Sequence, residues 1–496
     1  MHDLSEADVA SLAAQYNIDV SEGDLADLAA LANENLAGVG AVRDVATDQA
    51  STPGSDREWA RPQPGEYNAI ITECAVEPPN GAGDALAGRT VGLKDNIAVA
   101  GVPMTCGSPV LEGYVPTEDA MVVERLLDAG ATITAKTNLD EFGNVGQGSN
   151  GYRGPVRNPY DTDHTAGGSS GGSAVAVLTD MVDVALGTDT GGSVRIPAAY
   201  CGLVGHKPTA GLVPAVGMFE NTPLFDCIGP ITETVTDAAA VLDAIAGPTD
   251  IEPLTVRTAV RGGFDNGDAT SAATDPPPVE TLTLGRLSHG FSGNTETTVA
   301  EEVDARLDDL ADAGATIEDV TVADIEHATA VKSVMSLVSN AMYWGAGTHE
   351  NRDERSRRPF AADFSARRAA RGGQVNTQFK AKVIGGAALL ERDHGTLYRT
   401  ALSARERLQA AMADTLAGID AIVTPTTPTV PTHLDNSPPP FDYGQNVRPA
   451  SVTGSPATSI PAGIVDGLPV GLQLIGPLDE DAALLGMAAA VAAATE

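Results

Sequence analysis

The stretch DAMVVERLLDAGATITAKTN, residues 119–138, constrains the fold of this chain more than any other. Its first half has apolar residues at helical spacing, Gly130 stops the helix, and its second half is typical of a strand. A short buried strand that stops at Lys94 is predicted just before it, over residues 89–94. Helix and strand in this alternation are typical of an α/β protein with a parallel sheet.

The same alternation of helices and strands extends along most of the chain, so residues 66–496 are expected to form one domain. Residues 182–190 are predicted to form a strand that ends in a glycine turn, and residues 327–420 are mostly helical. The other predicted elements are helices at 173–180, from 194 onward, near 297–313 and at 481–496, and strands at 281–288, 315–322, 421–432 and 467–477.

Three segments depart from this alternation of helices and strands. Residues 1–65 are predicted to form two amphipathic helices that pack on the larger body, followed by a connector rich in proline and glycine. Residues 262–280 form a polar insertion that we expect to be mobile. The basic island at 350–373 could bind an anion, but its interspersed acids favour a helical surface whose charges pair with one another.

The net charge of −37, from 67 acidic and 30 basic residues, limits the partners of this chain. Because the acids are spread along the chain, they favour a solvated acidic surface suited to high salt over a site for a basic partner. Such a surface argues against direct binding of nucleic acid through its phosphates. Only six of the basic residues are lysines, so each lysine is a candidate for a specific role.

No stretch is long and apolar enough to predict a membrane span, and the first residues lack the pattern of a secretory signal. A cytoplasmic protein that does not bind a membrane is therefore expected. The four cysteines are widely spaced and the eight histidines are scattered. This spacing predicts buried thiols, with no disulfide and no metal site. No cofactor is expected.

The run TAGGSSGGSAVAV, residues 165–177, has three interpretations. A linker is disfavoured because helix-forming residues follow at once. A phosphate-binding loop would need a lysine within the run or just after it, and none is present. The G-x-S-x-G pattern of a hydrolase elbow fits around both Ser169 and Ser170, but no Ser–Asp–His order stands out downstream.

A second glycine-rich turn, within GTDTGGSVRIPAAYCG at 187–202, suggests what the first one does. Gly191 and Gly192 allow a tight turn whose N–H groups converge on one point. Ser193, at the end of this turn, can attack a carbonyl while those N–H groups receive the oxyanion. Two serine-bearing turns and Lys94 at a strand end suggest Ser–Ser–Lys chemistry, since a desolvated lysine can be neutral near pH 7 and act as a base.

These motifs, together with GLKDNI, AKTNLDEFG, IGPITETVTDAAAVLDAIAG and GLPVGLQLIGP, closely resemble those of the amidase signature family. The resemblance covers residues 66–496 and implies that family's α/β fold, with a large mixed central sheet covered by helices on both faces. It also implies a catalytic triad in which Ser169, next to a cis peptide bond, relays the proton of the nucleophile Ser193 to Lys94. The implied oxyanion hole consists of the backbone N–H groups of Thr190, Gly191, Gly192 and Ser193.

Further residues of the matched region receive supporting roles. Asp189 and Arg195 flank the nucleophile and are expected to hold its turn by hydrogen bonds, and Asp226 matches a family residue near the pocket. Ser170 stays the alternative to Ser169 as the relay. The residues expected to be structural or part of the core are Cys201, Lys136 and Lys207.

The resemblance implies hydrolysis of a small-molecule carboxylic acid amide to the acid and ammonia through an acyl-enzyme. The motifs GVPMTCGS, GPVRNPYD and GHKPTAGLVP look like those of stand-alone amidases that often accompany nitrile metabolism. A free-standing amidase, with a homodimer as one compatible state, is therefore expected. The alternative is the A subunit of the glutamyl-tRNA(Gln)/aspartyl-tRNA(Asn) amidotransferase, which releases ammonia from glutamine beside a partner that binds tRNA and ATP. A non-catalytic binding protein is disfavoured because Lys94, Ser169 and Ser193 are all present.

Overall fold

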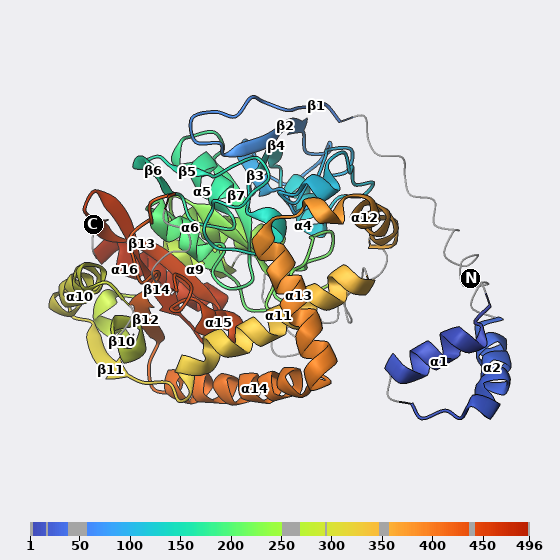
Figure 1. The fold of residues 1–496 in the computed structure, drawn as a ribbon. Coiled ribbons are helices and arrows are strands. Elements are labelled where there is room, and N and C mark those ends of the chain that lie inside the picture. The colour runs from blue at the N-terminus through green and yellow to red at the C-terminus, as the bar shows by residue number, and fades with distance from the viewer. Residues whose placement is uncertain are drawn as a thin grey trace. The chain divides into compact units, whose positions relative to one another are not determined.

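The computed structural model of the chain describes residues 3–15, 18–37, 57–249, 268–292, 295–346, 357–435 and 442–494 (Figure 1). The chain divides into two compact units, Met1–Pro53 and Gly54–Glu496, which are described separately. Among the described residues no helix is long and apolar enough to cross a membrane.

The smaller unit contains the two predicted helices, α1 (Glu6–Gln15) and α2 (Leu25–Ala37). The side-chain amide of Asn33 on α2 binds the segment just before α1: its Oδ1 accepts from the backbone N–H of Leu4 at 2.8 Å, and its Nδ2 donates to the Leu4 carbonyl at 3.0 Å. The prediction of two helices is confirmed. Their packing on the larger unit stays a prediction.

The larger unit is built on one mixed sheet of 12 strands. In spatial order the strands are β1 (Trp59–Ala60), β2 (Ile70–Val76), β4 (Thr132–Thr137), β3 (Thr90–Lys94), β7 (Val184–Asp189), β9 (Cys227–Thr232), β8 (Val204–Lys207), β13 (Ala457–Val465), β14 (Leu468–Ile475), β12 (Ala421–Pro425), β10 (Thr283–Leu287) and β11 (Thr316–Val320). Strands β4, β3 and β7 run parallel, as do β12, β10 and β11, whereas the strands between β7 and β12 pair antiparallel. A separate hairpin pairs β5 (Arg157–Asn158) with β6 (Asp161–Thr165).

Helices fill the connections. They are α4 (Met121–Asp128), α5 (Gly171–Leu178), α6 (Arg195–Tyr200), α7 (Val235–Ile245), α9 (Asp268–Thr274), α10 (Thr297–Asp312), α11 (Ala328–Ala346), α12 (Arg357–Arg371), α13 (Thr377–Asp393), α14 (Thr396–Leu416), α15 (Arg448–Thr453) and α16 (Asp481–Ala494). The crossover from β3 through α4 to β4 is the unit predicted from residues 119–138, and Gly130 adopts a positive φ of 92° just after the helix.

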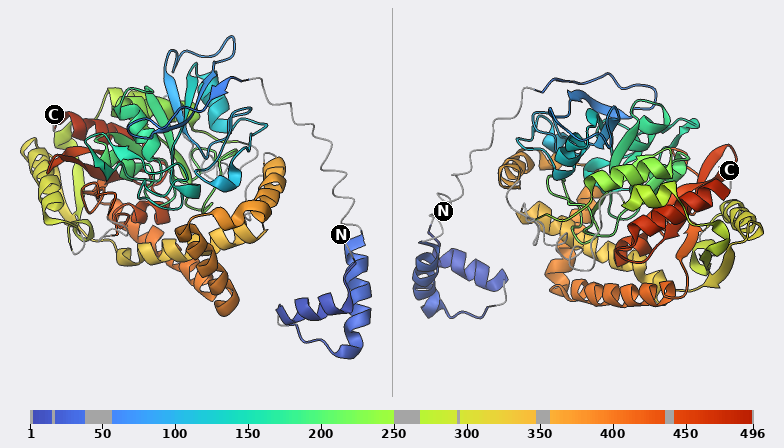
Figure 2. Two further views of the ribbon diagram at one scale, coloured as in Figure 1. Left: turned by 45° about the horizontal axis from the view of Figure 1, so that its top comes forward. Right: turned by 180° about the vertical axis from the view of Figure 1, so that it is seen from behind.

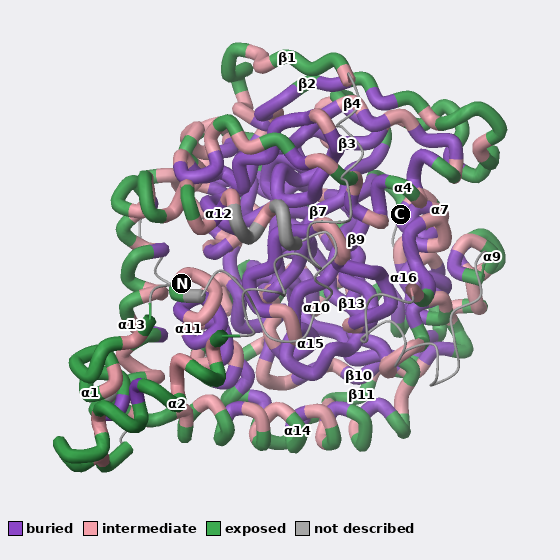
Figure 3. Tube along the Cα trace, turned by 90° about the vertical axis from the view of Figure 1, so that its right-hand side faces the viewer, coloured by how far each residue is buried: buried purple, intermediate pink, exposed green. Residues whose placement is uncertain are grey.

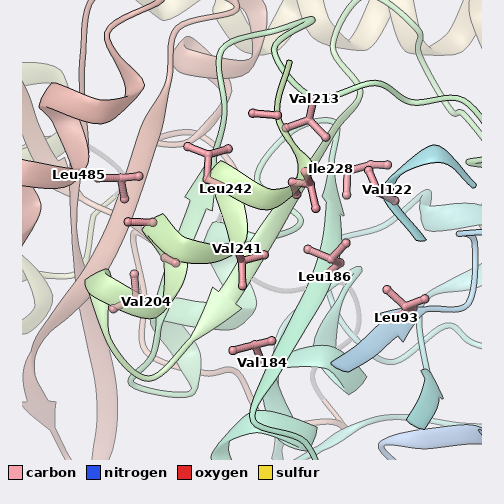
Figure 4. Packing of buried hydrophobic residues seen from close by; sticks show 14 of the residues in the cluster. Leu93, Val122, Val184, Leu186, Val204, Val213, Ile228, Val241, Leu242 and Leu485 are labelled. Atoms are coloured by element: carbon pink, nitrogen blue, oxygen red, sulfur yellow. The ribbon is translucent and has the colours of Figure 1, made fainter. Parts of the chain in front are cut away.

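Both faces of the sheet are covered, as predicted. Successive side chains of a strand point to opposite faces, and β7 shows the consequence. Leu186 belongs to the same apolar cluster as Leu242 of α7 (Figure 4), whereas Ala185 belongs to a second cluster with Val175 of α5 and Ala198 of α6. Seen from behind, α7, α9 and α16 lie over the first of these faces (Figure 2). Burial is concentrated on the central strands, while α13 and α14 alternate between buried and exposed residues (Figure 3).

The predictions for the polar insertion and for the basic island can be compared with the structure. The polar insertion predicted to be mobile contains the helix α9, which corrects that prediction for residues 268–274, while residues 262–267 lie outside the described residues. The described part of the basic island is the helix α12. Arg367 pairs with Asp363, as expected for a self-paired surface, and both Arg367 and Arg371 donate to the backbone carbonyl of Glu112.

Candidate active site

Two neighbouring parallel strands bring the predicted site residues to one edge of the sheet. Strand β3 ends at Lys94 and β7 ends at Asp189. The two strands pair directly, with Leu93 opposite Leu186. Because they run parallel, their carboxyl ends open on the same side. The turn that bears Ser193 follows β7 at once.

The Lys94 ammonium is completely buried and has only neutral hydrogen-bond partners. Nζ donates to Ser169 Oγ at 2.8 Å, to Thr188 Oγ1 at 2.8 Å and to the Thr188 carbonyl at 3.2 Å. No carboxylate of the described residues forms an ion pair with it. Burial lowers the pKa of Lys94 to about 7, although Asp140, Asp189 and Asp226 act in the opposite direction. This lysine can therefore exchange a proton near neutral pH.

Asp95, the neighbour of Lys94 in sequence, does not neutralise it. Its carboxylate pairs instead with Lys136, whose Nζ lies 2.8 Å from Asp95 Oδ1, and both side chains are fully buried. The other carboxylate oxygen, Oδ2, accepts from the backbone N–H and the hydroxyl of Thr105. Lys136 is thus structural, as predicted, and it leaves Lys94 free for Ser169.

Ser169 lies in a loop that packs against the segment around Asp140 and Gly143. The peptide bond between Gly168 and Ser169 is cis, as the resemblance implied. The Ser169 hydroxyl also contacts the carbonyl of Gly143 at 3.3 Å. Behind the loop, the buried Asp140 carboxylate accepts from the backbone N–H groups of Gly148 and Asn150, each at 2.8 Å. Burial raises the pKa of Asp140 to about 6 against these hydrogen bonds.

Ser170 occupies a different environment from Ser169. Its hydroxyl accepts from the backbone N–H of Thr188 at 3.2 Å and donates to the carbonyl of Thr188 at 3.3 Å. Its own N–H donates to the carbonyl of Ser193 at 3.2 Å, which ties the two glycine-rich turns together. Of the two candidate relays, only Ser169 therefore contacts Lys94.

A buried ion pair holds the turn that bears Ser193. Both carboxylate oxygens of Asp189 lie 3.0 Å from the guanidinium of Arg195. They also accept from the N–H groups of Gly192 at 2.7 Å and Val194 at 3.2 Å. Burial opposes ionisation of Asp189, but Arg195 and these N–H groups outweigh it and lower its pKa to about 2. The predicted support of the turn by Asp189 and Arg195 is thus present.

The hydrogen bond of Gly192 corrects the predicted oxyanion hole. Because its N–H already points to Asp189, it is not available to a ligand. The backbone N–H groups of Thr190, Gly191 and Ser193 make no hydrogen bond within the described part of the chain. These three amides are the free donors of the turn.

Asp226 fixes the first residue of this turn. It accepts from the Thr190 hydroxyl, and its second oxygen accepts from the backbone N–H groups of Asn221 at 2.7 Å and Thr222 at 2.8 Å. The carboxylate thus connects the turn to the segment before β9. This contact gives Asp226 a definite place, which the sequence left unclear.

Ser193 faces a cavity of about 570 Å³. Its hydroxyl makes no hydrogen bond with any residue that the structure describes. The cavity is lined by the turn itself, the loop after Gly143, one side of α11 and α13, and the start of α15: Gly143, Asn144, Val145, Gly146, Gln147, Thr190, Gly191, Ser193, Lys332, Ser333, Ser336, Leu337, Gln378, Ala381, Lys382, Asp442, Tyr443 and Arg448. An open serine with free amides beside it can attack a bound carbonyl and stabilise the resulting oxyanion.

Three cationic residues that line the cavity were missed from the sequence. Lys332, Lys382 and Arg448 come from three separate helices and belong to no motif. The one signal that could have found the first two is the scarcity of lysine in this chain, which makes each lysine informative.

The remaining candidates are structural. Cys201 is buried in the apolar cluster of α5 and α6, and burial raises the pKa of its thiol, which disfavours the reactive thiolate. All four cysteines are buried and free, as predicted. Lys207 is buried too, and its Nζ donates to the carbonyl of Pro208 at 2.7 Å.

The chain is similar to known proteins over most of its length. A sequence profile described as Amidase matches residues 72–485. Among curated relatives, the chain is 41% identical to the A subunit of the glutamyl-tRNA(Gln) amidotransferase of Halobacterium salinarum, with 86% of this chain and 99% of that protein covered. It is 38% identical to the corresponding protein of Haloarcula marismortui, over 83% and 96% of the two chains.

Solved structures share the fold. The A subunit of the glutamyl-tRNA(Gln) amidotransferase of Thermotoga maritima superposes with a TM-score of 0.70 at 30% identity, over 86% of this chain and 87% of that one. The native peptide amidase of Stenotrophomonas maltophilia gives a TM-score of 0.67 at 32% identity, over 83% of each chain.

Proposed function

This chain belongs to the amidase signature family, and from that premise we propose that it hydrolyses a carboxylic acid amide with Ser193 as nucleophile and Ser169 and Lys94 as proton relay. Its membership makes it a hydrolase of amide C–N bonds. The observation that carries the assignment of residues is the 2.8 Å hydrogen bond from the buried Lys94 Nζ to Ser169 Oγ.

The relay follows from the protonation state of Lys94. With a pKa of about 7, a large fraction of Lys94 is neutral at physiological pH. As Ser193 Oγ attacks the amide carbonyl, its proton passes to Ser169 Oγ, while the Ser169 proton passes to Lys94 Nζ. The relay then runs backwards and protonates the leaving nitrogen. Ammonia departs, and an ester between the acyl group and Ser193 remains. Water attacks this ester by the same path and releases the acid.

The negative charge on the carbonyl oxygen needs donors that are already in place. The free N–H groups of Thr190, Gly191 and Ser193 meet this need, whereas that of Gly192 is engaged with Asp189. Asp189 and Asp226 act indirectly: they fix the turn and its Thr190 side chain, and thereby the direction of the amides.

Two members of the family remain candidates for the physiological role. The sequence motifs favour a free-standing amidase, but the relatives of highest identity among those above are named as the A subunits of glutamyl-tRNA(Gln) amidotransferases. On that ground we place the amidotransferase role first: the chain would release ammonia from glutamine for a partner that modifies aminoacyl-tRNA. The free-standing amidase is the second candidate, supported by GVPMTCGS, GPVRNPYD and GHKPTAGLVP.

Ammonia release distinguishes the two roles. The chain alone and the chain mixed with the other subunits of a glutamyl-tRNA(Gln) amidotransferase are each given glutamine and a panel of aliphatic, aromatic and amino-acid amides in high salt. The amidotransferase role predicts glutamine turnover that rises strongly on addition of the partners. Rapid turnover of a simple amide, unchanged by the partners and without glutamine activity, would support the free-standing enzyme instead.

A further inference from the structure

His164 and His433 lie opposite each other on two antiparallel segments, and neither residue lines the cavity of Ser193. The residues that flank the two histidines bond across the segments through backbone N–H and carbonyl groups, at 3.0 Å on one side and 2.9 Å on the other. The histidines are therefore a non-hydrogen-bonded pair, the position at which side chains of antiparallel strands lie closest. The sequence did not reveal this pair because its members are far apart in the chain.

The two imidazole rings are spaced as metal ligands are. Their centres lie 5.3 Å apart, with the ring planes at 76°. Two imidazoles that share one tetrahedral Zn²⁺, with Zn–N bonds of about 2.0–2.1 Å, have ring centres roughly 5 Å apart. Nε2 of neither ring makes a hydrogen bond with any residue that the structure describes. The side chains are 23% and 40% exposed, so an ion and its water molecules can reach both rings.

A carboxylate lies beside the other nitrogen, Nδ1, of each ring. Asp161 Oδ2 is 3.1 Å from Nδ1 of His164, and Asp435 Oδ2 is 3.8 Å from Nδ1 of His433. When a metal binds Nε2, such a carboxylate accepts from the Nδ1–H group, fixes the tautomer and makes the ring a better ligand. A simple edge-to-face contact of two rings, which allows the same spacing, needs no such carboxylates.

The hydrogen bonding of the two rings leaves room for this change. Nδ1 of His164 is buried and makes no hydrogen bond, and a proton placed there beside Asp161 would remove that cost. Nδ1 of His433 accepts from the backbone N–H of Asp435 at 3.2 Å, so its proton resides on Nε2. Binding through Nε2 moves that proton to Nδ1, where the Asp435 carboxylate is the new partner, and no proton is released.

The charge of the two segments favours a cation. Residues 161–165 and 432–435 carry the carboxylates of Asp161, Asp163 and Asp435 and contain no lysine or arginine. Imidazole nitrogen selects transition metals such as Zn²⁺, whereas Mg²⁺ and Ca²⁺ prefer oxygen ligands.

We propose that His164 and His433 bind one Zn²⁺ ion through their Nε2 atoms, with Asp161 and Asp435 holding the rings and water filling the remaining positions. The ion clips residues 432–435 to β6, and β6 leads directly into the loop that bears Ser169. It acts on the stability of the folded chain and takes no part in the chemistry at Ser193. The site is therefore independent of the proposed function.

The test measures zinc binding to the full chain by calorimetry. The protein is first stripped with EDTA and dialysed, and the titration is run in fixed high sodium chloride with excess Mg²⁺ to occupy exposed carboxylates. The proposal predicts one Zn²⁺ per chain. It also predicts an affinity weaker by about 100-fold or more in His164→Ala and His433→Ala, and by about tenfold in Asp161→Asn, which keeps both rings.

His327→Ala is the matched control. His327 lies with Asp324 and Glu326 in an exposed group whose potential ligand atoms are within 4.8 Å of one another. Zinc binding that persists in His327→Ala and is lost in His433→Ala supports the proposal. Zinc binding that persists in His433→Ala, or no saturable binding by the wild type, would overturn it.

Thermal unfolding gives a second readout. Saturating zinc should raise the unfolding temperature of the wild type, because only the folded chain brings the two segments together. The increase should be absent in His433→Ala, whose unfolding temperature without zinc should match that of the wild type because the side chain is 40% exposed. Equal increases in the two proteins would contradict the site, and zinc binding without any increase would contradict the clip.

Discussion

At the scale of single residues, Lys94 decides what this site can do. It is buried, its three hydrogen-bond contacts are to neutral oxygens, and the carboxylate beside it in sequence is bound to Lys136. An ion pair would keep a buried lysine protonated and useless as a base. The proposed relay therefore depends on the separation of Lys94 from the Asp95 carboxylate.

The protonation of Lys94 predicts the pH profile of the enzyme. Below its pKa of about 7 the ammonium cannot accept a proton, so kcat/KM for a neutral amide should rise with pH through about 7 and then level off. Lys94→Ala should lose about 10²–10⁴-fold in kcat/KM. Lys380→Ala, an exposed lysine, should match the wild type. A flat profile, or full activity in Lys94→Ala, would contradict the role of Lys94.

The two adjacent serines provide a sharper comparison. Ser169→Ala removes the hydroxyl that contacts Lys94 and should lower kcat by about 10²-fold or more with little change in stability. Ser170→Ala removes the contacts to Thr188 and should mainly lower the unfolding temperature. Steady-state kinetics and thermal unfolding of both variants check this. The reverse pattern would make Ser170 the relay.

Part of the site could be predicted because its residues lie in glycine-rich turns at strand ends. The two serine-bearing turns and Lys94 suggested Ser–Ser–Lys chemistry from the residues alone, whereas the choice of Ser169 over Ser170 as the partner of Lys94 came from the family resemblance. Lys332 could not be placed in this way, since a lysine on a helix carries no sign of the cavity it faces. The hydrogen bond from the Gly192 N–H to Asp189 could not be predicted either, because the direction of an amide depends on the φ and ψ angles of the turn.

At the scale of elements, close packing explains why the second residue of α5 is a glycine. A Cβ atom on Gly172 would lie 2.4 Å from the backbone N of Asn138 and 2.5 Å from the carbonyl O of Ala69. Real side chains do not approach backbone atoms so closely. The helix that follows Ser169 can therefore approach the end of β4 only with glycine at this position.

Neighbouring glycines of this helix provide a stability test. Gly172→Ala should destabilise the protein by more than about 2 kcal/mol, because backbone atoms of two segments must move. Gly171→Ala is the matched control: its nearest contact would be Val156 Cβ at 3.4 Å, an ordinary separation, so little change is expected. Denaturant unfolding measures both. Equal stability of the two variants would contradict the packing described.

Two of the elements that were not predicted, β13 and α9, show physically why the sequence did not reveal them. Strand β13 contains Pro461, and its pairing with β14 shifts register between Pro461 and Gly463, so its sequence lacks a regular strand pattern. Helix α9 has a polar sequence, but the Asp243 carboxylate of α7 accepts from the N–H groups of Ala269 and Thr270 at its first turn. This cap comes from another helix and cannot be read from the segment itself.

At the scale of the whole molecule, the net charge of −37 sets the conditions under which the fold is stable. Unscreened carboxylates repel one another, and salt shortens the range of that repulsion. The unfolding temperature should therefore fall as sodium chloride is reduced from molar to tens of millimolar. Sucrose at equal osmolarity is the control, since it does not screen charge. An unfolding temperature independent of salt would contradict this account.

The identity of the nucleophile is the central claim, and trapping of the acyl-enzyme tests it most directly. The wild type is mixed with a hydrolysable amide, quenched in acid within the first turnover, digested and analysed by mass spectrometry. The account predicts an acyl group on Ser193 and neither an adduct nor ammonia release in Ser193→Ala. An adduct on another residue, or ammonia release by Ser193→Ala at the wild-type rate, would contradict it.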